Sequence, residues 1–250
     1  MSSSEVLYFI ILILLAFVPA LLYVRWFRNL EQYEREPYTT LISVFAYGAF
    51  LAVFFAVLLE YALYRVLMYE YELHEVLPFS TFLILVIIIA PISEEFIKPL
   101  GIVLRAKKDT NEVEDGIIYG AACGLGFAAT ENLMYGSAAL WAEGVTTASL
   151  LIAVRTISST LLHASATAIT GYGIGLWLVR KKPFSVIFPY FIFAVLLHAL
   201  FNLMAMTNTI FGLIFAIMIA VLATDFVKRK IIELDQRQSL KEVVDQIKKR

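Results

Sequence analysis

Two adjacent carboxylates interrupt an apolar stretch of this chain. Residues 88–101 read Ile-Ile-Ala-Pro-Ile-Ser-Glu-Glu-Phe-Ile-Lys-Pro-Leu-Gly and contain Glu94, Glu95 and Lys98. An acidic or basic residue at the centre of a membrane-spanning helix costs roughly 2.5 to 3.5 kcal/mol on insertion scales. Glu94 and Lys98 are four residues apart and share a helical face, whereas Glu95 points about 100° away. We therefore interpret the glutamates as part of a functional site, with Lys98 neutralising their charge.

Two prolines, Pro91 and Pro99, bracket the pair of glutamates. Proline lacks a backbone N–H and leaves helical carbonyls without a donor, which is tolerated at membrane depth only against protein or water. The sequence therefore predicts a broken, hydrated helix, which would suit hydrolysis.

Three further apolar stretches carry polar side chains near their middle. Glu131 lies in 116–141, His163 in 147–179, and His198 and Asn202, four residues apart, in 184–206. At 1.5 Å per residue, these residues and Glu94 lie about 15 to 24 Å from the ends of their stretches. Four segments thus bring carboxylates, imidazoles and a carboxamide to overlapping depths, and we expect them to share one cavity.

Two kinds of hydrolytic chemistry fit this set of side chains. In the first, a carboxylate acts as general base on a water while a histidine and an asparagine stabilise the oxyanion of a peptide carbonyl. In the second, histidines and glutamates bind Zn²⁺ and a further glutamate is the base. The candidate zinc ligands are Glu95, Glu131, His163 and His198. The zinc-protease spacing His-Glu-x-x-His is absent, so both chemistries stay open.

Each of these residues also has a purely structural interpretation. A single buried histidine such as His163 or His198 is often only a hydrogen-bond partner between membrane helices, although this explains the whole set poorly. For Glu60 and Arg155 a boundary role or a structural ion pair is favoured. The serines lack a Gly-x-Ser-x-Gly setting and are poor nucleophile candidates.

The composition is that of a polytopic membrane protein. Of 250 residues, 60% are hydrophobic, against about 45 to 50% in soluble domains, and the mean hydropathy is +0.80. The net charge of −1 and the lack of a continuous basic face argue against a nucleic-acid partner. Cys123 is the single cysteine, so no intrachain disulfide can form, and we expect it to be a small packing residue. No oligomeric state is indicated.

The apolar stretches predict an all-α transmembrane bundle of about seven spans. Basic residues follow every second span, which by the positive-inside rule puts the N-terminus outside and the C-terminus in the cytoplasm of a cell-membrane protein. Glycines at every fourth position, at 116, 120 and 124 and at 171 and 175, predict close helix packing. We expect a transmembrane peptidase domain at 1–230, an amphipathic cytoplasmic tail at 231–250 and an acidic outer loop at Tyr69–Glu75. The spans are expected at 5–24, 39–63, 79–104, 116–141, 147–179, 184–206 and 210–227.

Four motifs in this order resemble the PrsW family of intramembrane proteases. They are Ser-Glu-Glu-Phe-Ile-Lys at 93–98, Asp-Gly-Ile-Ile-Tyr-Gly-Ala-Ala-Cys-Gly-Leu-Gly-Phe-Ala-Ala-Thr-Glu-Asn at 115–132, His163 leading to Gly-Tyr-Gly at 171–173, and His-Ala-Leu-Phe-Asn at 198–202. The resemblance implies a multi-pass peptidase that cleaves membrane-anchored substrates, as in site-one regulated proteolysis, and a distant kinship with CAAX prenyl endopeptidases.

The resemblance also implies residue roles. Glu94 and Glu95 would activate or position the water, and His198 and Asn202 would stabilise the oxyanion. The chain departs from the Phe-x-x-x-His motif of the CAAX-type relatives, because Phe127 is followed at that spacing by Glu131. His163 is the candidate to replace the missing imidazole.

The leading hypothesis is therefore an intramembrane peptidase, with a glutamic or a metal-dependent mechanism, that uses Glu94, Glu95, His163, His198 and Asn202. The alternative is a proton- or cation-coupled transporter, because buried carboxylates and histidines also form proton relays. The absence of internal repeats counts against a transporter. A third possibility is a membrane receptor that has kept the fold without catalysis.

Overall fold

The computed structural model of the chain describes residues 3–74, 81–207 and 209–248, and every regular element in these ranges is helical. The predicted all-α fold is thereby confirmed. In chain order the elements are α1 (Ser3–Arg28), α2 (Tyr38–Ala46), the π-helical η1 (Tyr47–Ala52), α3 (Val53–His74), α4 (Thr81–Ile84), the π-helical η2 (Leu85–Ile89), α5 (Ala90–Ile97), the π-helical η3 (Ile102–Ala106), α6 (Val113–Glu143), α7 (Val145–Ile157), α8 (Ser159–Leu178), the 3₁₀ turn η4 (Phe184–Val186), α9 (Ile187–Met206) and α10 (Ile210–Lys248).

Five helical segments of the described chain are long and apolar enough to cross a membrane. They correspond to five of the seven predicted spans. The other two predicted spans are α6 and the interrupted segment from α4 to η3. The orientation of the termini across the membrane stays a prediction. The five segments are Val6–Arg28, Tyr38–Tyr69, Val145–Leu178, Phe184–Met206 and Ile210–Arg237.

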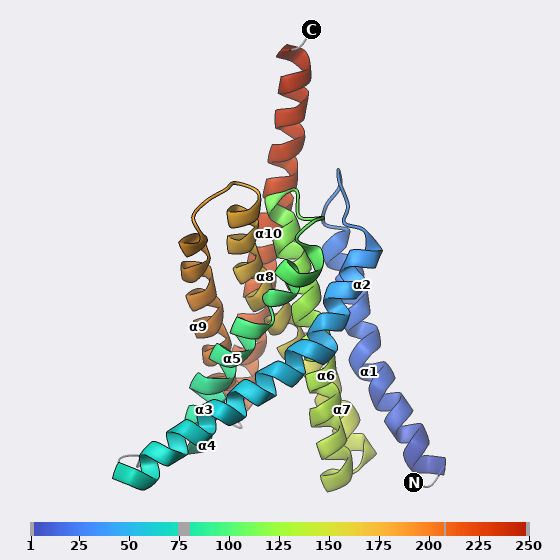
Figure 1. Cartoon of the computed structure of the whole chain (residues 1–250). Coiled ribbons are helices and arrows are strands. Elements are labelled where there is room, and N and C mark those ends of the chain that lie inside the picture. Colours follow the sequence, from blue (N-terminus) through green and yellow to red (C-terminus); the bar gives the residue numbers. More distant parts are fainter. Residues whose placement is uncertain (1–2, 75–80, 208, 249–250) are drawn as a thin grey trace.

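Helix α6 lies at the centre of the bundle and packs against α1, α2, α7, α8 and α10 (Figure 1). Every residue from Val113 to Ala129 is buried. A helix covered by protein on all sides gains more from close packing than from contact with lipid, and its glycines and alanines allow that packing. The central position of α6 explains why it is less hydrophobic than the outer spans.

The predicted glycine packing joins α6 to α8. A Cβ placed on Gly120 would lie 2.6 Å from the carbonyl oxygen of Thr167, and one placed on Gly124 would lie 2.2 Å from that of His163. Both distances are far below van der Waals contact, so only glycine allows this approach. The close contact fixes the height of His163 relative to α6. Cys123, on the same helix, is fully buried in the core.

The segment that carries Glu94 and Glu95 is a broken helix, as the two prolines predict. The π-helical η2 precedes α5, and a turn at Lys98 and Pro99 follows it. Pro91, near the start of α5, cannot donate a backbone hydrogen bond, and the chain widens into a π turn just before it. The two glutamates therefore lie on a helix of only eight residues between two interruptions.

Helix boundaries differ from the sequence prediction in several places. The prediction of an outer loop at Tyr69–Glu75 is wrong for residues 69–74, because α3 continues to His74. Glu75 and the expected start of the third span at Phe79 lie outside the described residues. The predicted span 147–179 bends at Ser158, whose φ and ψ are −116° and −81°. Backbone hydrogen bonds continue a helix beyond its apolar stretch, which a hydrophobicity pattern does not detect.

The last helix, α10, runs from Ile210 to Lys248 and extends well beyond the bundle (Figure 1). The expected amphipathic tail at 231–250 is thus helical as far as Lys248 and continuous with the last span. Its division from the preceding residues as a separate domain stays a prediction.

Candidate active site

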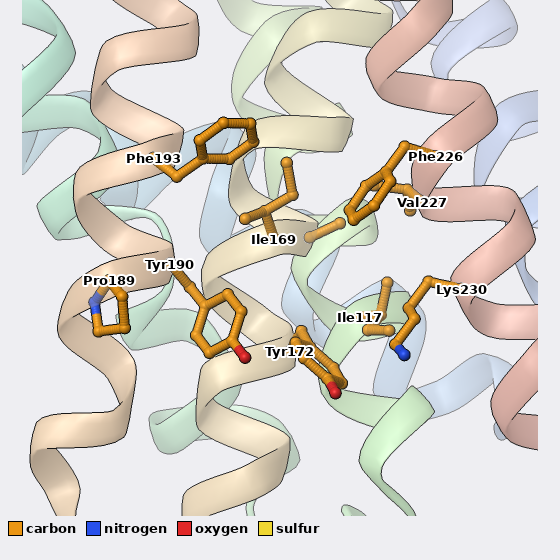
Figure 2. Close-up of a pocket in the computed structure, with 10 residues that line it drawn as sticks. Ile117, Ile169, Tyr172, Pro189, Tyr190, Phe193, Phe226, Val227 and Lys230 are labelled. Atoms are coloured by element: carbon orange, nitrogen blue, oxygen red, sulfur yellow. The ribbon is translucent and has the colours of Figure 1, made fainter.

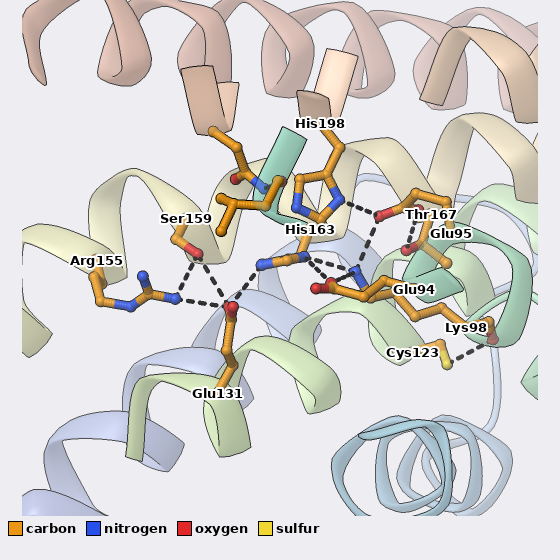
Figure 3. Close-up of polar contacts among 12 residues, drawn as sticks. Glu94, Glu95, Lys98, Cys123, Glu131, Arg155, Ser159, His163, Thr167 and His198 are labelled. Atoms are coloured by element: carbon orange, nitrogen blue, oxygen red, sulfur yellow. Dashed lines mark hydrogen bonds and ion pairs between the residues drawn. The ribbon is translucent and has the colours of Figure 1, made fainter. Parts of the chain in front are cut away.

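Lys98 connects the two glutamates of α5 to α8 (Figure 3). Its Nζ donates to Glu94 Oε2 at 2.7 Å and to Glu95 Oε1 at 2.9 Å, and it lies 2.7 Å from His163 Nδ1. An ammonium group has three protons, so these contacts use all of them. The expected ion pair between Glu94 and Lys98 is present, and Glu95 joins it from the next position. Lys98 is fully buried.

The two nitrogens of His163 have different partners. Because Lys98 can only donate, Nδ1 accepts and carries no proton. The other nitrogen, Nε2, therefore carries the proton and donates to Glu131 Oε2 at 2.8 Å. Glu94 Oε2 lies 3.7 Å from Nδ1, so Glu94 and Glu131 are near opposite nitrogens of the ring. Glu131 thus fixes the tautomer and orientation of His163 and directs its lone pair at Lys98, which also contacts the two α5 glutamates.

Arg155 holds Glu131 in turn. Its Nη2 donates to Glu131 Oε2 at 2.7 Å and to Ser159 Oγ at 3.0 Å, and its Nε donates to Asn132 Oδ1 at 2.7 Å. The sequence indicated a structural ion pair for Arg155 but did not reveal its partner. The signal was available, because Arg155, Ser159 and His163 recur at every fourth position and face the same side.

Glu95 and His198 form the deeper part of the cluster. His198 Nδ1 lies 3.0 Å from Glu95 Oε1, and Thr167 Oγ1 donates to Glu95 Oε2 at 3.2 Å. The rings of His163 and His198 meet edge to face with centroids 4.8 Å apart. Because an ionised carboxylate only accepts, Nδ1 of His198 carries the proton and Nε2 keeps a lone pair.

Asn202 contacts the break in the helix. Its Nδ2 donates to the carbonyl oxygen of Val86 at 2.9 Å. In the π turn, the N–H of Ala90 donates to the carbonyl oxygen of Leu85, five residues earlier. By the same spacing the carbonyl oxygen of Val86 would accept from residue 91, but this residue is a proline and has no N–H. The carboxamide therefore satisfies a carbonyl that the proline leaves open, and its second N–H is not used in this contact.

A cavity of about 740 Å³ opens beside the cluster. Of the predicted site residues, Glu94, Glu131, His163 and Asn202 line it, while Glu95 and His198 lie behind them. Most of the other lining side chains are aliphatic or aromatic and come from α3, η2 and α6 to α10. A space of this size and polarity suits an apolar peptide segment that presents one polar bond to the glutamates.

The cluster also has the donor set of a metal site. Glu94, Glu95, His163 and His198 each offer one ligand atom, and these four atoms lie within 4.8 Å of one another. Carboxylate oxygens and imidazole nitrogens are common zinc ligands, and a carboxylate on the far nitrogen of a histidine, as Glu131 is on His163, is typical around metals. The residues therefore fit a metal. Glu131, named in the sequence analysis as a candidate ligand, lies outside this group and contacts it through His163.

A second cavity, of about 300 Å³, lies between α8, α9 and α10 (Figure 2). Its wall is formed by aliphatic and aromatic side chains and by Lys230. No carboxylate or imidazole of the described chain lines this space, so it is not a candidate for hydrolysis. It is lined in part by the two tyrosines Tyr172 and Tyr190, whose rings meet edge to face.

Comparison with known proteins agrees with this geometry. Residues 36–226 match the model of the PrsW family intramembrane metalloproteases. The chain is 29% identical over 216 residues to "Protease PrsW" from Clostridioides difficile (strain 630), which covers 84% of this chain and 86% of that protein. No solved structure was found to match. The matched region contains every residue of the cluster, and the chain belongs to the PrsW family of intramembrane metalloproteases.

Proposed function

We propose that this protease hydrolyses a peptide bond of a membrane-anchored protein in the 740 Å³ cavity, using a water activated by Glu94. One observation carries the proposal: Glu94, Glu95, His163 and His198 converge within 4.8 Å beside a large cavity with mostly apolar walls. Such a cavity can hold an extended or unwound stretch of an apolar segment, with its scissile carbonyl directed at the cluster.

Glu94 is the candidate general base. It lines the cavity, and its side chain is 8% exposed, whereas that of Glu95 is fully buried. Its carboxylate would take a proton from the attacking water as the water oxygen bonds to the carbonyl carbon. The same group would return that proton to the amine nitrogen as the C–N bond breaks. Lys98 forms ion pairs with both glutamates and so balances their charge in a buried site.

Glu95, His163 and His198 are the candidate metal ligands. Two histidines and one glutamate form a known catalytic zinc set with an open position for a water or substrate. Bound there, Zn²⁺ would supply a Lewis acid that polarises the peptide carbonyl and makes water more acidic. Lys98 Nζ now contacts two of these three side chains, so it would have to withdraw from them when the metal binds.

Asn202 is the candidate donor to the oxyanion. It lines the cavity, and one N–H of its carboxamide stays available while the other is held by Val86. A donor fixed in advance stabilises developing negative charge without reorganisation. His198 suits this role less well, because its proton is directed at Glu95 and only the doubly protonated ring could donate from Nε2.

The direct test is cleavage of a reporter with one transmembrane segment by reconstituted enzyme. We expect Glu94→Gln, Glu95→Gln and His163→Ala to lose cleavage by at least about 100-fold, the range for loss of a general base. Glu143→Gln, which removes an exposed carboxylate from α6, is the matched control and should cleave normally. Full cleavage by all three cluster variants would refute the assignment.

Metal dependence needs its own measurement. Elemental analysis of purified protein should find about one zinc per chain in the wild type and much less in His198→Ala. A chelator should stop reporter cleavage, and added Zn²⁺ should restore it. Cleavage that continues in metal-free protein would show instead that the carboxylates act without zinc.

A further inference from the structure

A second group of buried carboxylates lies away from the active site, where the loop between α1 and α2 meets the start of α6. All its members are less than 8% exposed. None forms an ion pair with a lysine or arginine side chain that the structure describes. Arg180 and Arg237 line a cavity together with Glu112 and Glu114 but form no ion pair with these glutamates. So many carboxylates without an ion pair are costly to bury. The group consists of Glu31, Glu36, Glu112, Glu114 and Asp115.

Backbone amides hold three of these carboxylates in place. Asp115 Oδ2 accepts from the N–H groups of Asn111 and Glu112, both at 2.7 Å. Glu112 is the N-cap of α6, and its carboxylate accepts from the backbone N–H of Asp115. Glu31 Oε2 accepts from Glu36 N–H at 3.3 Å. The carboxylates are therefore positioned by the fold itself, as in a capping box.

Three of them have one oxygen without a partner. Glu31 Oε1, Glu114 Oε1 and Asp115 Oδ1 are buried and accept no hydrogen bond from the described residues. The side chains of Glu31 and Asp115 are 0% and 1% exposed. A buried acceptor without a donor costs free energy, so each such atom in a folded protein calls for an explanation. Here the unpartnered atoms all belong to one group of carboxylates.

We propose that Glu31, Glu112 and Asp115 form a binding site for a divalent cation of the size of Ca²⁺. One oxygen of each lies within 4.8 Å of one oxygen of each of the others. Calcium binds oxygens at about 2.3 to 2.6 Å, so ligands around one ion lie at most about 4.6 to 5.2 Å apart, and separations within 4.8 Å are compatible with this limit. A donor set made only of carboxylate oxygens suits Ca²⁺ better than it suits softer metals. Glu36 lies beside Asp115, and Glu114 lies beside Glu112, so both could add further oxygens.

Protonation is the competing way to neutralise this group. Burial, followed by the charge of Asp115, raises the pKa of Glu31 to about 9. A proton shared between Asp115 and Glu36 removes charge and gives the Asp115 carboxyl a hydrogen-bond partner. Glu31 Oε1 still has no partner among the described residues. A cation removes the same charge and would coordinate Glu31 as well, so it also accounts for the oxygen that this shared proton leaves without a partner.

The cation would bridge the loop after α1 and the first turn of α6. Glu31 comes from the loop, whereas Glu112 and Asp115 open the helix that carries Glu131 about four turns later. Binding of the cation would stabilise the start of α6, at the end of the bundle from which α10 extends. This site does not depend on the mechanism proposed for the active site.

The test is Ca²⁺ binding to the purified full-length protein in detergent. We expect Ca²⁺ at about 100 times its Kd to raise Tm by about 5 °C, with KCl of matched ionic strength giving no rise. Tb³⁺ in place of Ca²⁺ should luminesce on excitation of tyrosine, because the hydroxyl of Tyr119 donates to Glu36 beside the site. Added Ca²⁺ should displace this signal.

Three variants locate the binding. Glu31→Gln/Asp115→Asn keeps the side-chain shapes and should lose both signals. Asp225→Asn/Glu233→Gln removes the same charge from α10, where these side chains are 44% and 42% exposed, and should keep both. Glu94→Gln/Glu95→Gln should also keep both, which separates this site from the active site. A wild type without a Ca²⁺-dependent shift or Tb³⁺ signal would overturn the proposal, as would an unchanged response in Glu31→Gln/Asp115→Asn.

Discussion

Lys98 is the cation that the two buried glutamates contact in this structure. It bonds to Glu94, Glu95 and His163 at 2.7 to 2.9 Å and lies over the ring of Phe127, with Nζ 4.1 Å from the centroid. Two adjacent carboxylates at this depth would otherwise repel each other and lose hydration. Any metal that enters the cluster competes with this ammonium group for the same donors.

Replacing Lys98 by methionine should therefore destabilise the metal-free protein. Lys98→Met keeps the length of the side chain but leaves two buried carboxylates without a cation, which costs about 3 to 5 kcal/mol when one partner of a buried pair is removed. Thermal unfolding in detergent measures the loss, with the exposed Lys108→Met as the control. Equal Tm values for Lys98→Met and the wild type would contradict the role given to Lys98.

Glu131 acts on the reaction through His163, so its replacement should change turnover more than substrate binding. Glu131→Gln keeps the side chain's shape but loses the charge that fixes the histidine tautomer. Partners of this kind typically contribute 10- to 100-fold, and we expect kcat to fall by about that factor with KM nearly unchanged. Reporter kinetics in proteoliposomes give both constants. A raised KM with an unchanged kcat would instead assign Glu131 to substrate binding.

At the scale of elements, the contact between α6 and α8 determines the geometry of the site. Glu131 comes from α6 and His163 from α8, and their 2.8 Å bond depends on how closely the two helices approach. Gly124 sets that approach, because it lies directly against the backbone carbonyl of His163. A ridge of small residues therefore positions the contact between Glu131 and His163 without being part of the cluster.

Adding one methyl group at this contact should separate the two helices. In Gly124→Ala the new Cβ would lie 2.2 Å from the carbonyl oxygen of His163, so backbone must move, which typically costs about 1 to 3 kcal/mol. Cleavage should fall together with Tm. Gly136→Ala is the matched control on α6, since its Cβ would approach side-chain atoms, Cδ1 and Cγ1 of Ile152 at 2.3 and 2.7 Å, and no backbone of another helix. Similar losses in both variants would argue against this account.

For the molecule as a whole, the proposed function makes the cavity the place where a substrate reaches the glutamates. Membership in a family of intramembrane proteases makes the chain an enzyme, so the transporter and receptor alternatives do not describe it. The buried carboxylates and histidines form one cluster beside a space with mostly apolar walls, which we propose to be the site of hydrolysis. A transmembrane substrate would have to enter this space from between the surrounding helices.

A bulky side chain in the cavity wall should therefore impede the reporter. Ala205 lines the cavity from α9, and Ala205→Trp should raise KM for the transmembrane reporter, because it occupies space that the substrate needs. Leu203→Trp changes an exposed position of the same helix and should cleave like the wild type. An unchanged KM for Ala205→Trp would indicate that the substrate binds elsewhere.

The sequence by itself determined the class of fold, the membrane location and the identity of the residues around the cluster. Long apolar stretches can only be buried in lipid or protein, and charged residues within them are costly, so both features stand out in a linear pattern. Glu94, His163 and His198 were recognisable for this reason. Prolines at 91 and 99 indicated the broken helix because their effect on the backbone is local.

The tertiary structure alone decided the partners. Periodicity gives the face of a helix on which a residue lies, but not the rotation and height at which two helices pack. For that reason Glu131 was expected among the ligands but contacts His163 from outside the group, and Asn202 bonds to Val86, more than 100 residues away. The carboxylate group at Glu31 and Asp115 escaped notice because it joins two segments about 80 residues apart, which no local pattern connects.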